Sequence, residues 1–321
     1  MISKKFFLHV LLSGIILFKG CESFENLSPD VVLLDESATP SHNTKNVIII
    51  VIDGPRFSET WGDPTHALIP NLTNNLGPLG NHYSWFYNQG PSITSAGLTA
   101  LTTGRYQRMK NDGSELPKSP SIFQLYLNQT RKDPRSAQII TSKAKLSILA
   151  DCTDGNWRGR FNPLVNAEDR EDSVTYKLAI NSLIQDQPNL MLIHFRGPDA
   201  GGHAGDWTAY LNSIIETDEY VWDLWLFLQG HEIYKNNTAL FVTNDHGRHL
   251  DHIKEGFVSH GDNCEGCRHI SLFAIGPDFH KGNTPNDRRE LTDIAPTIAE
   301  LLGFQMPHSE GKILSELFIN N

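Results

Sequence analysis

The sequence predicts a layered α/β fold. Three apolar runs, at residues 47–52, 190–195 and 239–242, each lead into a short polar segment, and the first consists entirely of β-branched residues. Unbroken runs of this kind are typical of parallel strands that helices bury on both faces. Residues 207–229 have the spacing of a long amphipathic helix. Active sites of open α/β sheets lie just beyond the carboxyl ends of the strands, so the polar segments there are the first place to look for function.

The other elements follow from local patterns. In the helix expected at residues 119–128, Ser119 is predicted as the N-cap and Pro120 as the first helical residue. Residues 151–172 are polar and are predicted as a long loop, which is either a lid facing the substrate or an ordinary surface excursion. Further strands are expected at residues 83–87, 136–140 and 270–275, and helices at residues 71–76, 94–104, 143–149, 174–184, 290–302 and 313–318.

The N-terminus has the pattern of an export signal. Lys4 and Lys5 precede an apolar run at residues 6–18, and Gly20-Cys21 resembles a bacterial lipoprotein cleavage site. We therefore expect a signal peptide at residues 1–20, a polar tether at 21–45 and a single folded domain at 46–321. The protein is expected to be exported and lipid-anchored through Cys21 at the periplasmic or outer-membrane face of a bacterium, or else secreted.

The charge argues against nucleic acid as a partner. The 321 residues carry a formal net charge of −10. The first twenty residues contribute three lysines and no acid, so the rest of the chain has 24 basic and 37 acidic residues and a charge of −13. An acidic surface repels a phosphate backbone. No stretch after residue 20 is long and apolar enough to span a bilayer, which leaves the lipid as the only membrane contact.

The spacing of the cysteines favours a local disulfide between Cys264 and Cys267. If Cys21 is lipidated, Cys152, Cys264 and Cys267 remain. A structural zinc site usually needs two such pairs, and a redox motif should open a helix, whereas residues 268–269 lead straight into a strand. In an oxidising compartment, a disulfide between Cys264 and Cys267 is therefore the favoured interpretation.

Several strand ends carry groups that bind metals. Asp53 follows the first buried strand, and Asp245 with His246 follows the third. A carboxylate beside an imidazole suits a first-row divalent ion, although an aspartate before glycine can also be a simple turn cap. Asp199 and His203 lie four residues apart in a segment whose glycines and proline argue against a regular helix.

Two further residues complete the candidate set. His260 stands in a small-residue turn just ahead of a strand and is a third histidine ligand, while His249, His252 and His269 are expected to be solvent-facing or supporting. Thr94 opens a predicted helix, where the positive end of the helix dipole favours an alkoxide. From the local pattern alone, Thr94 or the next residue is more simply an N-cap.

Together these motifs resemble the alkaline-phosphatase superfamily of metal-dependent hydrolases, and most closely its nucleotide pyrophosphatase/phosphodiesterase and sulfatase-like branches. The resemblance covers nearly all of residues 46–321. It implies a three-layer sandwich, in which helices flank a mostly parallel central sheet. The matching segments are residues 51–56, Thr94 with residues 101–106, 199–203, 245–247, 259–261 and 292–298.

The resemblance implies a site with two divalent cations, zinc by the number of histidines, with manganese or magnesium as alternatives. One cation would be held by Asp53, Thr94, Asp245 and His246, and the other by Asp199, His203 and His260. Thr94 would be the nucleophile that attacks a phosphate ester, in a phosphodiesterase or phosphatase reaction on a small anionic substrate. Sulfatases carry a modified cysteine at this position, within a Cys-x-Pro-Ser-Arg motif that is missing here.

Four alternatives remain open. The scaffold also suits a sulfatase, a phosphonate hydrolase or a phosphotransferase. A catalytically silent metal-binding lipoprotein is an alternative from a different class, although a hydroxyl residue at the nucleophile position argues against silence.

Overall fold

The computed structural model describes residues 42–319, and the predicted signal peptide, Cys21 and most of the tether lie outside them. Eight strands form one sheet in the order β4-β3-β5-β1-β6-β7-β2-β8. From β4 to β6 all neighbours are parallel, whereas β7 runs antiparallel to both β6 and β2. The strands are β1 Asn46–Ile52, β2 Asn81–Tyr87, β3 Ala137–Thr141, β4 Leu164–Ala167, β5 Leu190–Phe195, β6 Thr238–Asn244, β7 His269–Ile275 and β8 Arg289–Glu290.

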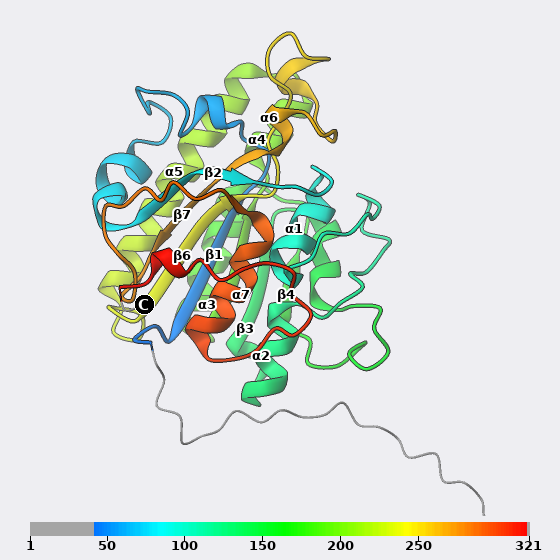
Figure 1. Cartoon of the computed structure of the whole chain (residues 1–321), viewed down its shortest axis with the longest axis vertical. Coiled ribbons are helices and arrows are strands. Elements are labelled where there is room, and N and C mark those ends of the chain that lie inside the picture. Colours follow the sequence, from blue (N-terminus) through cyan, green and yellow to red (C-terminus); the bar gives the residue numbers. More distant parts are fainter. Residues whose placement is uncertain (1–41, 320–321) are drawn as a thin grey trace, which may run out of the picture. The chain divides into compact units, whose positions relative to one another are not determined.

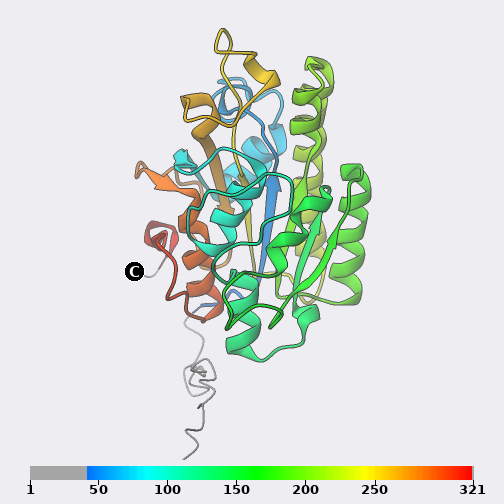
Figure 2. The same cartoon turned by 90° about the vertical axis from the view of Figure 1, so that its right-hand side faces the viewer.

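Helices cover both faces of the sheet, as the edge-on view shows (Figure 2). The α-helices are α1 Thr94–Thr103, α2 Ile122–Thr130, α3 Asp172–Gln185, α4 Gly197–His203, α5 Trp207–Gly230, α6 Glu265–Arg268 and α7 Ile294–Leu302. The first, second and last of these pack on one face, while α3 and α5 pack on the other. The predicted three-layer, mostly parallel α/β sandwich is confirmed.

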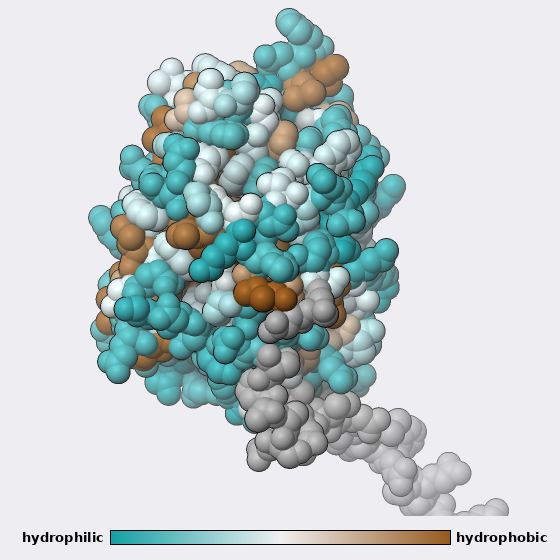
Figure 3. Space-filling model, turned by 60° about the vertical axis from the view of Figure 1, so that its left-hand side comes forward, coloured by the Kyte–Doolittle hydropathy of each residue, from teal (hydrophilic) through white to brown (hydrophobic). Residues whose placement is uncertain are grey.

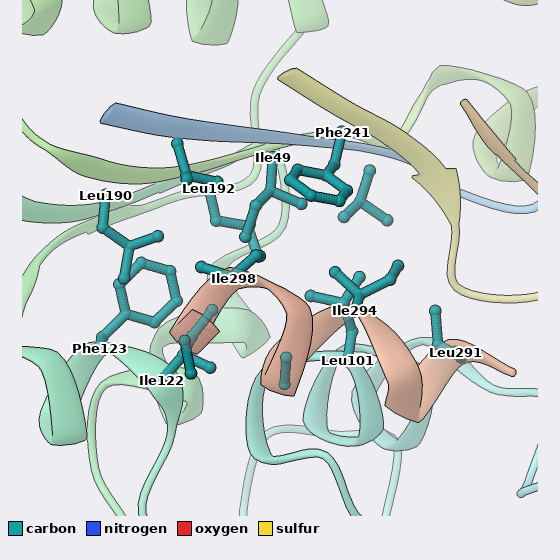
Figure 4. Close-up of a cluster of buried hydrophobic side chains, with 14 of the residues drawn as sticks. Ile49, Leu101, Ile122, Phe123, Leu190, Leu192, Phe241, Leu291, Ile294 and Ile298 are labelled. Carbon is teal, nitrogen blue, oxygen red and sulfur yellow. The ribbon is translucent and has the colours of Figure 1, made fainter. Parts of the chain in front are cut away.

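The central strand β1 shows why its sequence is an unbroken apolar run. Val47, Ile49 and Val51 belong to the core on one face, and Ile48 and Ile50 belong to the core on the other. Side chains alternate between the faces of a strand, so a strand covered on both sides needs an apolar residue at every position. Figure 4 shows the first of these cores, where Ile49 and Leu192 of the strands meet Ile294 and Ile298 of α7, together with labelled side chains of α1 and α2.

Three local predictions are wrong. Ser121, not Ser119, caps α2, because its side chain accepts a hydrogen bond from the backbone N–H of Gln124. Residues 151–172 are not only an irregular loop, since Leu164–Ala167 pairs in parallel with β3 as the edge strand β4. Whether the rest of this segment acts as a lid stays a prediction. The last expected helix is only a 3-10 turn, Ser315–Leu317.

On the face in Figure 3, apolar residues are dispersed among hydrophilic ones. Single exposed apolar side chains are ordinary and need no partner. Among the described residues, none of the helices combines the length and hydropathy that crossing a bilayer requires. Strand β1 runs to the end of the sheet where α4 and α6 lie in Figure 1, and this edge is where an active site is expected.

Candidate metal centre

Strand register brings the first two carboxylates together. The last residue of β1, Ile52, pairs with Asn244 of β6, so Asp53 and Asp245 follow at the same edge of the sheet. Both aspartates are fully buried. Asp53 is not a turn cap, since its Oδ2 faces His194 and Lys143, while its Oδ1 has no hydrogen-bond partner. A buried carboxylate oxygen without a partner is costly unless a cation binds it.

His246 lies at the centre of the first ligand group. Its Nε2 is 3.3 Å from Asp53 Oδ1, 3.4 Å from Asp245 Oδ2 and 3.5 Å from Thr94 Oγ1. Like Asp53 Oδ1, Asp245 Oδ2 is buried without a hydrogen bond. Four potential ligand atoms from three different segments of the chain therefore converge.

The His246 ring is oriented for metal binding. Its Nδ1 lies 2.9 Å from the carbonyl oxygen of Gly247, which can only accept, so Nδ1 carries the proton and Nε2 presents a lone pair. Burial, followed by the nearby His260, lowers the pKa of His246 to about 4. The ring is therefore neutral at physiological pH, which is the form that binds a metal.

The second ligand group is formed by Asp199, His203 and His260. His203 Nε2 is 3.1 Å from His260 Nε2 and 3.3 Å from Asp199 Oδ1, and His260 Nε2 is 3.4 Å from the same oxygen. His260 also donates from Nδ1 to a backbone carbonyl, that of Ser92, at 2.8 Å, which again leaves Nε2 as the ligand atom.

The segment that carries Asp199 and His203 is an α-helix, contrary to the prediction. In α4 the spacing of four residues puts both side chains on one face of the helix. Pro198 is tolerated because it lies in the first turn, where its missing N–H costs nothing. Gly201 and Gly202 serve packing, since added Cβ atoms would lie 2.6 Å from Tyr210 N and 2.5 Å from the Arg248 guanidinium.

These separations match those of metal ligands. Zinc bonds to histidine nitrogen and carboxylate oxygen at about 2.0–2.2 Å in a tetrahedron, whose ligand atoms are then roughly 3.3–3.5 Å apart. The six distances within the two groups lie between 3.1 and 3.5 Å. The donor set fits two divalent cations, so the structure brings all seven predicted site residues into one cluster with suitable geometry.

Thr94 is the first residue of α1 and does not cap it. The N-cap is Ile93, and the helix has no side-chain cap, so the local interpretation of Thr94 or Ser95 as a cap is wrong. Thr94 is buried, and its hydroxyl is 3.4 Å from Lys143 Nζ in addition to its contact with His246. The Thr94 hydroxyl therefore faces both the ligand cluster and the Lys143 ammonium.

Sequence reasoning missed three residues of the centre. Lys143 follows the carboxyl end of β3 and lies 2.6 Å from both Asp53 Oδ2 and Asp199 Oδ2, between the two ligand groups. His194 of β5 contacts Asp53 Oδ2 at 2.9 Å. The fully buried Arg248 pairs with Asp199 Oδ1 and also donates to the carbonyls of residues 257 and 258. The strand-end rule could have found Lys143.

The carboxylates of the centre remain short of positive charge. Burial alone would raise the pKa of Asp53, but Lys143 and the hydrogen bond from His194 bring it well below its usual range. Burial, and then the charge of Asp53, raise the pKa of Asp245 well above its usual range. The charge of Asp53 is thus compensated by Lys143, whereas Asp245 would take up a proton unless a further cation binds beside it.

Family comparison agrees with this geometry. The sequence model of the Metalloenzyme superfamily matches residues 136–306, more than half of the chain. The chain belongs to this superfamily. The matched residues carry Asp199, His203, Asp245, His246 and His260, and the predicted relationship to the alkaline-phosphatase superfamily is confirmed.

Curated relatives of this superfamily member align with parts of longer proteins. A 2,3-bisphosphoglycerate-independent phosphoglycerate mutase of Gracilaria tenuistipitata var. liui is 29% identical over 137 residues, which is 40% of this chain and 24% of the mutase. GPI ethanolamine phosphate transferase 2 of Aspergillus oryzae is 28% identical over 266 residues, 72% of this chain and 29% of the transferase. The chain thus spans less than a third of the length of either relative.

Solved structures support the fold. The alkaline phosphatase PafA superposes with a TM-score of 0.65 at 12% identity, covering 88% of this chain and all (100%) of the compared chain. At that identity the likeness establishes the alkaline-phosphatase-like fold and leaves the reaction to be argued from the site.

The cysteine prediction is wrong in two respects. Cys264 and Cys267 are free thiols and form no disulfide. Cys264 is the N-cap of α6, so the motif does open a short helix. Burial, and then contact with Cys264, raise the pKa of Cys267 to about 12, which does not suit redox chemistry. His249, expected to be solvent-facing or supporting, is 2% exposed.

Proposed function

We propose that this protein is a metal-dependent phosphoesterase in which Thr94 attacks the phosphorus of a small anionic ester. The observation that carries the proposal is the position of the Thr94 hydroxyl, which lies 3.5 Å from His246 Nε2 and 3.4 Å from Lys143 Nζ at the edge of two ligand groups. Bound divalent cations, zinc by preference, would supply the charge that lowers the pKa of this hydroxyl and stabilises the phosphoryl oxygens.

The residues of the chain have separate tasks in this proposal. His246 and His260 present Nε2 atoms whose direction is fixed by carbonyl partners. Lys143 can donate to a developing oxyanion near Thr94, because its ammonium lies between the two ligand groups. Arg248 orients Asp199 and is too deeply enclosed to contact substrate.

Charge supports an anionic substrate. Two dications, Lys143 and Arg248 would bring six positive charges against three aspartates, so the centre would carry a net +3 before Thr94 ionises. Such a site favours a phosphate ester, and the names of the two curated relatives also refer to phosphate chemistry. Hydrolysis and transfer to an alcohol share the first step and differ in the acceptor.

The test is a panel of aryl phosphate monoesters, diesters, phosphonates and sulfates, assayed with the metal-loaded protein. We expect turnover of phosphate esters that Thr94→Ala abolishes and Thr94→Ser partly retains. Ser95→Ala is the matched control, since this neighbouring buried hydroxyl makes no hydrogen bond. Trapped phosphoenzyme should carry its phosphate on Thr94.

Other outcomes would change the assignment. Turnover that survives Thr94→Ala would refute the nucleophile. Turnover of sulfates or phosphonates alone would support the alternative hydrolases, and product formation only with an added alcohol would indicate a phosphotransferase. Metal retention without any turnover would support a silent metal-binding lipoprotein.

We further propose export and lipid anchoring at Cys21, on the strength of Lys4, Lys5 and the apolar run that follows. Cell fractionation and mass spectrometry of the mature N-terminus test this. A Cys21→Ala variant should lose the membrane association, and an N-terminus that retains residues 1–20 would contradict the proposal.

A further inference from the structure

A second cluster of metal-binding side chains lies outside the proposed centre. His249, Asp262, Cys264 and Cys267 each offer a ligand atom, and these four atoms all lie within 4.8 Å of one another. They come from the connection between β6 and β7, where Figure 1 shows α6 at the upper end of the molecule. We propose that these four residues bind a structural divalent cation of the zinc type, which holds this connection in place independently of any catalysis.

The strongest observation is the state of His249. Its Nδ1 is 2.8 Å from Ser259 Oγ, and the Ser259 hydroxyl itself donates to Glu255 Oε2. Because the Ser259 hydroxyl donates its hydrogen to Glu255, its oxygen can only accept from His249 Nδ1. Nδ1 therefore carries the proton of the ring, and Nε2 has a free lone pair. His249 is 2% exposed and its Nε2 makes no hydrogen bond.

Asp262 lies close to His249 Nε2 but makes no hydrogen bond with it. Its Oδ2 is 3.1 Å from His249 Nε2, yet the two atoms are not aligned for a hydrogen bond. Two atoms that both present lone pairs at this distance repel each other unless a cation lies between them. The separation is also close to the edge of a zinc tetrahedron, roughly 3.3–3.5 Å for one nitrogen and one oxygen.

The cysteines complete the set. Cys267 is fully buried, and its backbone N–H donates to Cys264 Sγ at 3.3 Å, an orientation that stabilises a thiolate at that sulfur. Sulfur ligands at about 2.3 Å from zinc lie roughly 3.8 Å apart, so the cluster needs to close by about 1 Å or less.

The charges also balance. A dication with two thiolates and one carboxylate carries −1, and Lys254, whose ammonium pairs with Asp262 Oδ2, supplies the compensating charge. Asp262 Oδ1 accepts the backbone N–H of Cys264 at 2.9 Å, which fixes the carboxylate toward the cluster.

The cluster supports the segments that carry the proposed centre. The carbonyl of Cys267 accepts the N–H of Gly247 at 2.9 Å, next to His246. The carbonyl of Asp262 accepts the hydroxyl of Ser92 at 2.6 Å, and the carbonyl of Ser92 in turn holds His260. A cation at the cluster would therefore help to hold the backbone next to His246 and, through Ser92, the ring of His260.

Cobalt substitution tests the proposal with a readout other than activity. Thiolate bound to Co²⁺ gives a charge-transfer absorption in the near ultraviolet, whereas the proposed centre offers only nitrogen and oxygen ligands. We expect the band in the metal-stripped, cobalt-loaded protein, and we expect Cys264→Ser and Cys267→Ser to lose it. Cys152→Ser is the matched control, because this buried free thiol lies outside the cluster, and it should keep the band.

Metal analysis and mass spectrometry complete the experiment. The zinc content should fall by about one equivalent per chain in the cysteine variants and in His249→Asn. The spectrum of the wild-type protein decides the question even if a variant fails to fold. Absence of the band after cobalt loading under reducing conditions, or a Cys264–Cys267 disulfide in freshly isolated protein, would overturn the proposal.

Discussion

Replacing Lys143 by methionine separates the charge of this side chain from its length. The Lys143 ammonium lies 2.6 Å from a carboxylate oxygen of both Asp53 and Asp199, and the side chain is only 13% exposed. Methionine keeps an unbranched, flexible side chain without the charge. In the metal-stripped protein the variant would leave two buried carboxylates without this cation.

The size of the effect follows from burial. Breaking a buried ion pair by removing one partner costs about 3–5 kcal/mol, because the remaining charge is uncompensated. For a domain of this size each kcal/mol lowers Tm by about 2–4 °C, so the metal-stripped variant should unfold roughly 6–20 °C below the wild type. Bound cations would neutralise the same carboxylates, so the loss should be smaller in the metal-loaded protein.

Turnover should fall as well. Lys143 Nζ is 3.4 Å from Thr94 Oγ1, close enough to donate to an oxyanion formed there. Removing one such donor typically lowers kcat about 10²–10³-fold. The assays are thermal unfolding with and without metal and steady-state kinetics on the best phosphate ester.

Lys145→Met is the control for Lys143→Met. Lys145 is two residues away and donates to Asn111 at 3.0 Å, outside the ligand cluster. This variant should change both readouts little. An unchanged Tm of the metal-stripped Lys143→Met protein together with unchanged kcat would refute the role we assign to this charge.

Two more predictions concern buried groups. His194 contacts Asp53 Oδ2 at 2.9 Å, so His194→Leu should weaken metal affinity about 10–100-fold in a chelator competition, while the exposed His252→Leu should not. Burial raises the pKa of Asp218 from 3.8 to about 6. As the pH rises from about 4 to 6, Asp218 therefore loses its proton in the unfolded chain before it does so in the folded protein. Over this range the free energy of unfolding should fall by about 3 kcal/mol relative to the Asp218→Asn variant. Urea titrations across this range measure it, and parallel pH profiles would contradict the assignment.

The sequence predicted the parts of the site that depend on strands. Residues 47–52 are predicted as a strand buried on both faces, because the run is short, every position is apolar and every side chain is β-branched. Once that strand is assigned, the rule that sites lie beyond strand ends leads to Asp53 and Asp245. Their proximity then follows from the pairing of Ile52 with Asn244.

Helix α4 was missed because intrinsic propensity is a weak guide where tertiary contacts dominate. Pro198, Gly201 and Gly202 would each discourage a helix in an isolated peptide. In the folded chain both glycines lie against α5 or Arg248, in places where a Cβ would clash. The glycines indicate close packing, and no pattern within residues 197–203 distinguishes that from flexibility.

The residues that the sequence analysis missed were missed for different reasons. Lys143 follows a strand that was predicted, and the strand-end rule was applied to acids and histidines but not to lysines. His194 lies within β5, where a buried polar residue is detectable but its partner is not. The ligands that accompany Cys264 and Cys267 are separated along the chain, since His249 lies well before the pair, and only the fold brings them together.

The connection between β6 and β7 carries residues of both proposed metal sites. It carries Asp245 and His246 at its start, Arg248 and His249 next, and His260 and Asp262 before the cysteines. Added Cβ atoms at Gly247 and Gly266 would collide with the backbone of the opposite arm, so the two arms of the connection touch directly. Ordering a long connection costs conformational entropy. With both proposed metal sites occupied, the ligands at the two ends of the connection would offset part of that cost and would hold the segment beside the proposed nucleophile.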